Sequence, residues 1–202
     1  KSIHSGLWTI IKKKKYIRDK DNKYLVTEDD WKTVVQTEKI GYDYQCDKDT
    51  DNIYKGKLIA NLGKEKAQVI LEELEKIKKI WEKVITHRKL KICAGKIEVE
   101  SIGENTEKYN GNLMSDGERA IFHYIGEVVS AKDNSLIIID EPENHLHNSI
   151  LEKLWNEIEA ERQDCVYLYI THNLYFARSR NNAQIIWIKN MLDKQKWDFE
   201  LL

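Results

Sequence analysis

The sequence predicts an α/β fold with a mostly parallel central sheet, a long amphipathic helix and a terminal strand pair. Two short apolar runs, 136–140 and 165–170, flank a helical pattern, which is the order expected of a crossover between parallel strands. Residues 65–88 place apolar side chains at helical spacing among many lysines and glutamates. Two further segments with the pattern of strands, 184–189 and 197–202, close the chain and favour a strand pair.

The composition is typical of a globular chain. The 202 residues are 41% hydrophobic, which is enough to bury a core, and 33 basic against 34 acidic residues leave a net charge of −1. This balance provides no whole-chain field that would attract nucleic acid. Cys46, Cys93 and Cys165 form no CxxC pair, so we expect neither disulfides nor a zinc site, and a reducing cytoplasm fits best. No apolar stretch approaches the roughly 20 residues of a membrane helix, so no membrane association is expected.

The N-terminal half divides into two predicted regions. Residues 1–61 have the pattern of an irregular polar insertion or peripheral region, with one short helical signal at 27–35. Residues 62–108 are expected to hold the amphipathic helix followed by two short strands within 89–101, which turn at Ala94 and Gly95. The apolar face of that helix is predicted to include Leu71, Leu74, Trp81 and Val84 or Ile85.

Residues 109–202 form the third predicted region. A helix is expected over 118–131, and Ser149 followed by Glu152 is expected to open the next one. Because the run 136–140 has no polar alternation, we expect a strand that is covered on both faces. The first helix should bury Ile121, Tyr124, Ile125, Val128 and Val129.

The strand at 136–140 ends in two adjacent carboxylates, Asp140 and Glu141. Ligands of open α/β sheets bind at this end of the strands. In nucleotide hydrolysis the first acid can hold Mg²⁺ and the second can orient the attacking water. Pro142, the only proline, would end the strand there. Such a position is functional more often than not, and the alternative for the pair taken alone is two solvated carboxylates.

Two further motifs flank this acidic strand. LMSDGERA places Ser115 and Gly117 just before a helix, so a hydroxyl, backbone N–H groups and the positive helix end can converge on an anion. The alternative is a simple N-cap formed by Ser115 or Asp116. ITHN places His172 at the end of the next strand, where it could donate a hydrogen bond to a phosphate, although a lone histidine there is also compatible with a structural role.

LMSDGERA, LIIIDEPENHLH and YITHN resemble the signature loop, the Walker B strand with its D-loop, and the switch histidine of ABC-type ATPase heads. The sequences of these motifs are similar to those in the ATPase halves of overcoming-lysogenization-defect proteins and related phage-defence systems. The resemblance covers about 109–202 and implies a partial P-loop NTPase fold of ABC type that uses ATP and Mg²⁺. Asp116 stands where transporter signatures commonly have glycine, and the phage-defence branch resembles this chain in that substitution.

The resemblance also implies roles for individual residues. Asp140 would bind Mg²⁺, Glu141 would be the catalytic base, and His172 would sense the γ-phosphate. In a nucleotide-dependent homodimer, the signature residues facing the nucleotide of the second copy would be Ser115, Gly117 and Glu118. The D-loop residues contacting that copy would be Glu143, Asn144, His145 and His147. His145 and His147 also form an HxH beside two acids, which is an alternative metal site.

The sequence contains no GxxxxGK[ST] loop. The nearest match ends at Gly63 and Lys64, but Leu58 replaces the first glycine and Glu65 replaces the hydroxyl. The Q-loop has only weak candidates in Gln36, Gln45 and Gln68. We therefore expect the P-loop and Q-loop to lie N-terminal to Lys1, and this chain alone to be inactive.

Two functions of different class follow from these motifs. The first is an ATPase head that couples nucleotide-driven dimerisation to an effector, such as a nuclease-like or nucleic-acid-associated module, C-terminal or separate. The second is a non-catalytic interaction or regulatory module that retains the fold. A transporter's nucleotide-binding domain is disfavoured by the SDGER wording and by the charged helix at 65–88.

Overall fold

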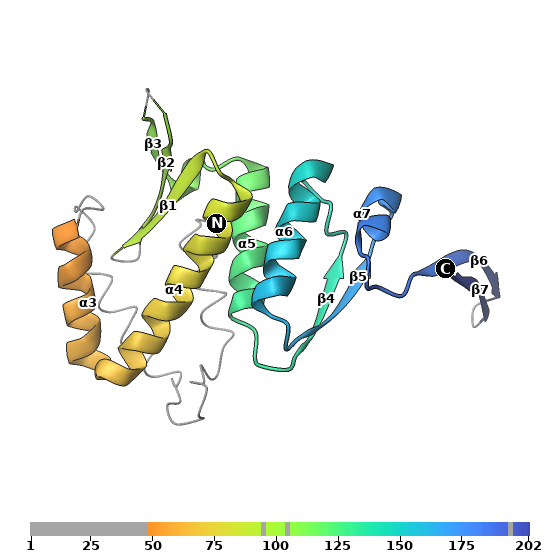
Figure 1. Ribbon diagram of the computed structural model, residues 1–202, viewed down its shortest axis with the longest axis horizontal. Coiled ribbons are helices and arrows are strands. Elements are labelled where there is room, and N and C mark those ends of the chain that lie inside the picture. Colours follow the sequence, from red (N-terminus) through yellow and green to blue (C-terminus); the bar gives the residue numbers. More distant parts are fainter. Residues whose placement is uncertain (1–47, 94–95, 104–105, 194–195) are drawn as a thin grey trace.

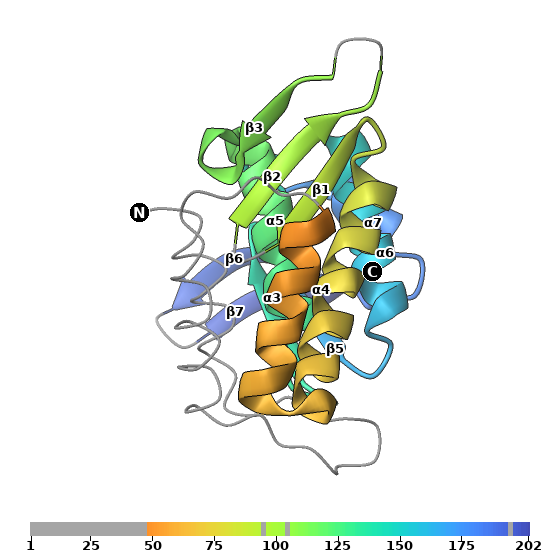
Figure 2. The same ribbon diagram turned by 90° about the vertical axis from the view of Figure 1, so that its left-hand side faces the viewer.

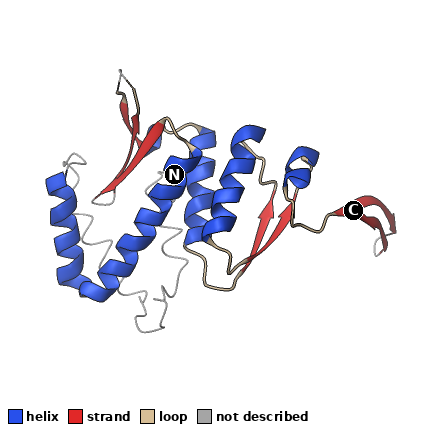
Figure 3. Cartoon of the chain, in the orientation of Figure 1, coloured by secondary structure: helices blue, strands red, loops and turns tan. Residues whose placement is uncertain are grey.

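The computed structural model describes residues 48–93, 96–103, 106–193 and 196–202 (Figures 1 and 3). The helices are α3 (Lys48–Leu62), α4 (Lys64–Val84), η1 (Gly111–Leu113, a 3₁₀ turn), α5 (Asp116–Val129), α6 (Asn148–Glu161) and α7 (Leu174–Ser179). The strands are β1 (Arg88–Cys93), β2 (Lys96–Ser101), β3 (Lys108–Asn110), β4 (Leu136–Asp140), β5 (Val166–Ile170), β6 (Ile186–Asp193) and β7 (Lys196–Leu201). Within the described ranges they form an antiparallel β1-β2-β3 sheet, a parallel β4-β5 pair and an antiparallel β6-β7 hairpin.

The predicted amphipathic helix is confirmed as α4, which ends at Val84. Its buried side packs into the main core together with α5 and α6 (Figure 1). Leu71 and Leu74, predicted on its apolar face, are only partly buried. The buried residues of α4 are Ala67, Ile70, Ile77, Ile80, Trp81 and Val84.

The region up to residue 61 was expected to be irregular, but its last part forms α3. Figure 2 shows α3 running alongside α4, and Gly63 at φ 83° makes the turn between them, a conformation that glycine adopts at little cost. Leu58 is fully buried. A helix with so little apolar surface gives a weak periodic signal and is stabilised chiefly by its neighbour. The helical signal at 27–35 lies outside the described residues.

The two strands predicted within 89–101 are confirmed as β1 and β2, and their turn at 94–95 lies outside the described residues. Leu90, Ile92, Ile97 and Val99 are buried in the core. The short strand β3, which the sequence analysis did not predict, pairs with β2. A three-residue strand is too short to give a period-2 signal.

Helix α5 begins two residues earlier than predicted because Ser115 caps it. The side chain of Ser115 accepts from the backbone of Glu118, and the Glu118 carboxylate accepts from the backbone of Ser115, which completes a capping box. Phe122 is buried on this helix and meets Trp81 edge to face, whereas the predicted core residue Tyr124 is only partly buried.

Strands β4 and β5 are parallel neighbours, and Asp140 pairs with Ile170 in their register. One face packs on the core, where Tyr169 makes an edge contact with Trp155 of α6. The expectation that this strand is covered on both faces is wrong for the described residues. The opposite face exposes a continuous apolar surface formed by Leu136, Ile138, Val166, Leu168 and Ile170. Residues 136–139 are all apolar, so the sequence of β4 did not distinguish a covered face from an open one.

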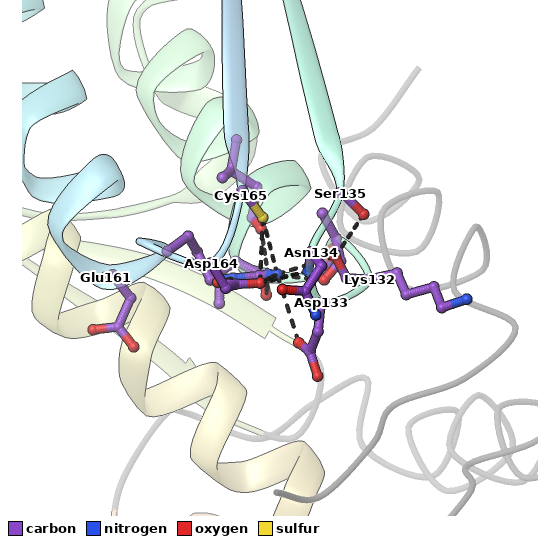
Figure 4. Close-up of polar contacts among 12 residues, drawn as sticks. Lys132, Asp133, Asn134, Ser135, Glu161, Asp164 and Cys165 are labelled. Carbon is purple, nitrogen blue, oxygen red and sulfur yellow. Dashed lines mark hydrogen bonds and ion pairs between the residues drawn. The ribbon is translucent and has the colours of Figure 1, made fainter. Parts of the chain in front are cut away.

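Helix α6 is capped by His147 rather than opened by Ser149. Figure 4 shows Asp164 and Cys165 beside residues 132–135, which follow α5. At the other end of α6 lies Arg162, whose guanidinium donates to four carbonyls at and just after the end of α5 and to Asp164 before β5. This contact fixes the end of α5 against the start of β5.

The predicted terminal strands are confirmed as the β6-β7 hairpin, although 194–195 at its turn lie outside the described residues. In Figure 1 the hairpin projects beyond β5. In the described part of the chain, no helix is long and apolar enough to cross a membrane.

Candidate functional site

The acidic pair lies at the C-terminal edge of the parallel strands. Asp140 ends β4, and the N–H of Glu141 donates to Ile170 of β5 over 2.8 Å. Both carboxylates belong to exposed residues, while Pro142 behind them is buried. Glu141 has φ 51°, a left-handed conformation that costs a non-glycine residue about 1–3 kcal/mol and is concentrated at functional sites. The side chain of Asn144 donates to Glu141 Oε2 over 2.7 Å and holds this carboxylate in place.

His172 lies at the same edge because β4 and β5 are parallel neighbours. Its side chain is exposed, and its backbone N–H donates to Glu143 Oε1 over 3.1 Å. The hydroxyl of Thr171 lies 2.8 and 2.7 Å from the two oxygens of Glu143. The fold therefore brings together the predicted residues Asp140, Glu141 and His172, and joins their loops through Glu143.

Glu118, which the sequence predicts to be a signature residue, is engaged within the protomer. Its Oε1 accepts from Tyr109 over 2.5 Å, and its Oε2 accepts from the Ser115 backbone over 2.9 Å. Burial raises the pKa of Glu118, but the hydrogen bonds from Tyr109 and Ser115 outweigh it and hold that pKa below its usual value. Burial, followed by the bond to Glu118, raises the pKa of Tyr109 to about 12. The alternative of Ser115 as an N-cap is thus realised.

Gly117 lies directly against the loop that follows the acidic strand. A Cβ added at Gly117 would lie 3.0 Å from the carbonyl oxygen of His145, a residue held at φ 63°. The sequence predicts an anion beside Gly117, whereas its contact in the structure is with the loop between β4 and α6 of the same protomer. Glycine permits this contact because any side chain would displace the loop.

The HxH pair gives no metal site among the described residues. His147 lies 2.9 Å from the Ser149 hydroxyl through Nδ1 and caps α6. The ranges that the structure describes contain no group of three or more His, Cys, Asp or Glu able to hold a metal ion. Of the Q-loop candidates, Gln68 lies on α4 and donates to Glu72, while Gln36 and Gln45 lie outside the described residues.

The sequence family described as "AAA domain, putative AbiEii toxin, Type IV TA system" matches residues 109–186, which contain all three motifs but less than half of the chain. A comparison with curated proteins gave no match. Among solved structures, one reported for the ATP-driven dimerization and DNA stimulated activation of SMC ATPases aligns at TM-score 0.50 and 15% identity, covering 67% of this chain and 88% of that one.

Two archaeal Smc head domains are also similar. The Pyrococcus furiosus head with an extended coiled coil, bound to the C-terminal domain of ScpA, aligns at TM-score 0.53 and 13% identity, covering 75% of this chain and 38% of that one. The Pyrococcus yayanosii head with a coiled coil and joint gives the same score, identity and coverage of this chain, and 29% of that one. The chain has the fold of an SMC ATPase head. It is thus an α/β fold, and the chain spans well under half the length of these two head structures.

The sequence motifs predict which residues lie at this edge of the strands, but not their contacts inside the protomer. Thr171 was missed as a partner of Glu143, although it stands next to His172 in the ITHN motif. Tyr109 was missed as a partner of Glu118 because it lies on β3, an element too short to predict.

Proposed function

We propose that this chain is the C-terminal part of a dimerising ABC-type ATPase head that binds and hydrolyses ATP with Mg²⁺. The observation that carries the proposal is the placement of Asp140, Glu141 and His172 at one edge of two adjacent parallel strands. An acid for the metal, an acid for the water and an imidazole for the phosphate are groups that can together serve phosphoanhydride hydrolysis.

The donor set fits Mg²⁺, which takes one or two carboxylates and completes its shell with water and substrate phosphates. Bound there, Mg²⁺ would neutralise charge on the phosphates. Asp140 would be its protein ligand. Glu141, presented by a left-handed backbone and held by Asn144, orients the attacking water and accepts its proton. The exposed imidazole of His172 donates a hydrogen bond to the terminal phosphate.

The proposal includes a second copy of the chain. Ser115 and Gly117 would present the first turn of α5 to nucleotide held by that copy, because a helix start favours anions. Glu118 would act by shaping this turn, since its carboxylate is engaged by Ser115 and Tyr109. The D-loop residues Asn144, His145 and His147 would contact the second copy. One solved structure of similar fold is described in terms of ATP-driven dimerization.

A P-loop outside these 202 residues would complete the site, since the sequence contains none. The exposed apolar face of β4 and β5 supports this, because such a face is stabilised by a further layer of the domain.

The biological setting that we propose is a cytoplasmic ATPase of the overcoming-lysogenization-defect type, which acts in phage defence through a nuclease-like effector. Its support is the SDGER and DEPExHLH wording and the toxin–antitoxin description of the matched family.

The test is ATP turnover by the complete gene product with and without Glu141→Gln. We expect Mg²⁺-dependent hydrolysis that falls roughly 100-fold or more in this variant. Glu82→Gln, which changes an exposed carboxylate on α4, is the matched control and should hydrolyse normally. Normal turnover by Glu141→Gln would refute the assignment of the base. No turnover by the complete wild-type product would instead favour a non-catalytic interaction module.

A further inference from the structure

The carboxylate of Glu143 connects the two loops that carry the proposed catalytic groups. Glu143 follows Pro142 in the loop between β4 and α6, and it reaches the loop that follows β5. Its oxygens lie 2.8 and 2.7 Å from the Thr171 hydroxyl, and Oε1 also accepts the His172 N–H over 3.1 Å. Its partners are thus the residue before His172 and the backbone of His172 itself.

Further hydrogen bonds extend this contact on the far side of Thr171. The Thr171 hydroxyl accepts from the backbone of Asn173 over 2.9 Å. The side chain of Asn173 accepts from Phe176 over 3.1 Å, which caps α7, and donates to Asn148 at the start of α6 over 2.7 Å. The histidine loop is therefore bonded on both sides to the segment that follows the acidic strand.

Helix α5 contacts the loop between β4 and α6 at another point. Gly117 faces the carbonyl oxygen of His145, two residues after Glu143. A displacement of the first turn of α5 would therefore press on the loop that carries Glu143. Through Glu143, that displacement would reach the backbone of His172.

We propose that Glu143 is a positioning residue that sets the backbone position of His172. Through this contact it couples the position of α5 to the position of His172 within one protomer. This inference rests on the proposed function, and it gives Glu143 an intramolecular role in place of the expected contact with the second copy. Glu143 touches neither nucleotide nor water in this account. Its contribution is to hold the imidazole of His172 where the phosphate is bound.

Side-chain chemistry provides graded variants for a test. Alanine at 143 removes every acceptor, while glutamine keeps one oxygen that can accept from both Thr171 and His172. At position 171, valine removes the hydroxyl that bonds Glu143 and Asn173, while serine keeps it. Glu82→Ala, which removes an exposed carboxylate on α4, is the matched control.

The first measurement is amide hydrogen exchange on the 202-residue chain. We expect faster exchange at His172 and Asn173 in Glu143→Ala and Thr171→Val, and wild-type exchange there in Glu143→Gln, Thr171→Ser and the control. Exchange at His172 that stays at the wild-type rate in Glu143→Ala would overturn the proposal. Because this readout needs no nucleotide, it decides the role of Glu143 even if the complete gene product proves not to be an ATPase.

The second measurement is ATP turnover by the complete gene product. We expect Glu143→Ala to lower kcat roughly 10- to 100-fold with little change in KM, because a displaced group loses catalytic alignment rather than binding. Glutamine should restore most of kcat. In a His172→Ala background, Glu143→Ala should cause no further loss. A full additional loss there would show that Glu143 acts independently of His172 and would overturn the proposal.

Discussion

Replacement of Arg162 by methionine should remove the guanidinium that links the end of α5 to the start of β5. Arg162 is 6% exposed, and Nη1 donates to Val128, Val129 and Ala131 over 2.9, 3.1 and 2.8 Å. Its Nε and Nη2 donate to Asp164 over 2.8 and 2.9 Å. Methionine retains much of the side-chain volume but leaves these carbonyls and the Asp164 carboxylate without their donor.

The magnitude follows from these contacts. Breaking a buried ion pair by removing one partner costs about 3–5 kcal/mol. Since the Asp164 side chain is 33% exposed and can be solvated, we expect the lower end, about 3 kcal/mol. Arg162→Lys keeps the charge but not the planar fork, so its loss should be smaller, roughly 1–2 kcal/mol.

Urea unfolding of the 202-residue chain measures both variants, with an unchanged slope expected if only stability changes. The hydrogen bonds from Arg162, opposed in part by burial, hold the pKa of Asp164 well below its usual value. A lowered folded-state pKa stabilises the protein above the unfolded value of about 3.9, and this stabilisation is lost as the pH falls below it. The difference between wild type and Arg162→Met should therefore shrink below about pH 4. A loss under about 1 kcal/mol at neutral pH, or one that persists unchanged in acid, would refute this reasoning.

Two further predictions concern the loop contact and the open sheet face. Gly117→Ala should cost about 1–3 kcal/mol because its Cβ would lie 3.0 Å from His145 O, whereas Gly56→Ala in α3 meets nothing within 4 Å and should stabilise by about 0.5–1 kcal/mol. Urea unfolding compares them, and equal effects would contradict the contact. Ile138→Gln, at a position 59% exposed, should change the stability of this chain by less than about 0.5 kcal/mol. In the complete gene product it should cost about 2 kcal/mol if a further layer covers the face, and a similarly small effect in both would argue against that layer.

The sequence predicted the elements that have strong periodicity. The boundaries of β4 were correct, and the order of β4, α6 and β5 correctly placed His172 beside the acidic strand. It was wrong where tertiary contacts decide the outcome. An apolar strand such as β4 has the same sequence pattern whether one face or both are covered. The helical form of 48–61 depends on packing against α4, which composition does not reveal.

The polar contacts of the site show the same limit. Glu143 and Glu118 were assigned from their motifs to a second copy, yet both carboxylates are engaged by residues of the same chain. Thr171 lies 28 residues from Glu143 in the sequence. Tyr109, the partner of Glu118, lies on β3, an element too short to predict. His147 replaced Ser149 as the helix cap because its imidazole nitrogen accepts from the Ser149 backbone.

The central claim, a dimerising ATPase head, is tested most directly by the mass in solution of the complete gene product carrying Glu141→Gln, measured by light scattering with and without Mg²⁺ and ATP. With the water-orienting carboxylate removed, hydrolysis should stop, and ATP should hold two copies together. We predict a stable dimer with ATP and a monomer without it. A mass that is unchanged by ATP would contradict the account.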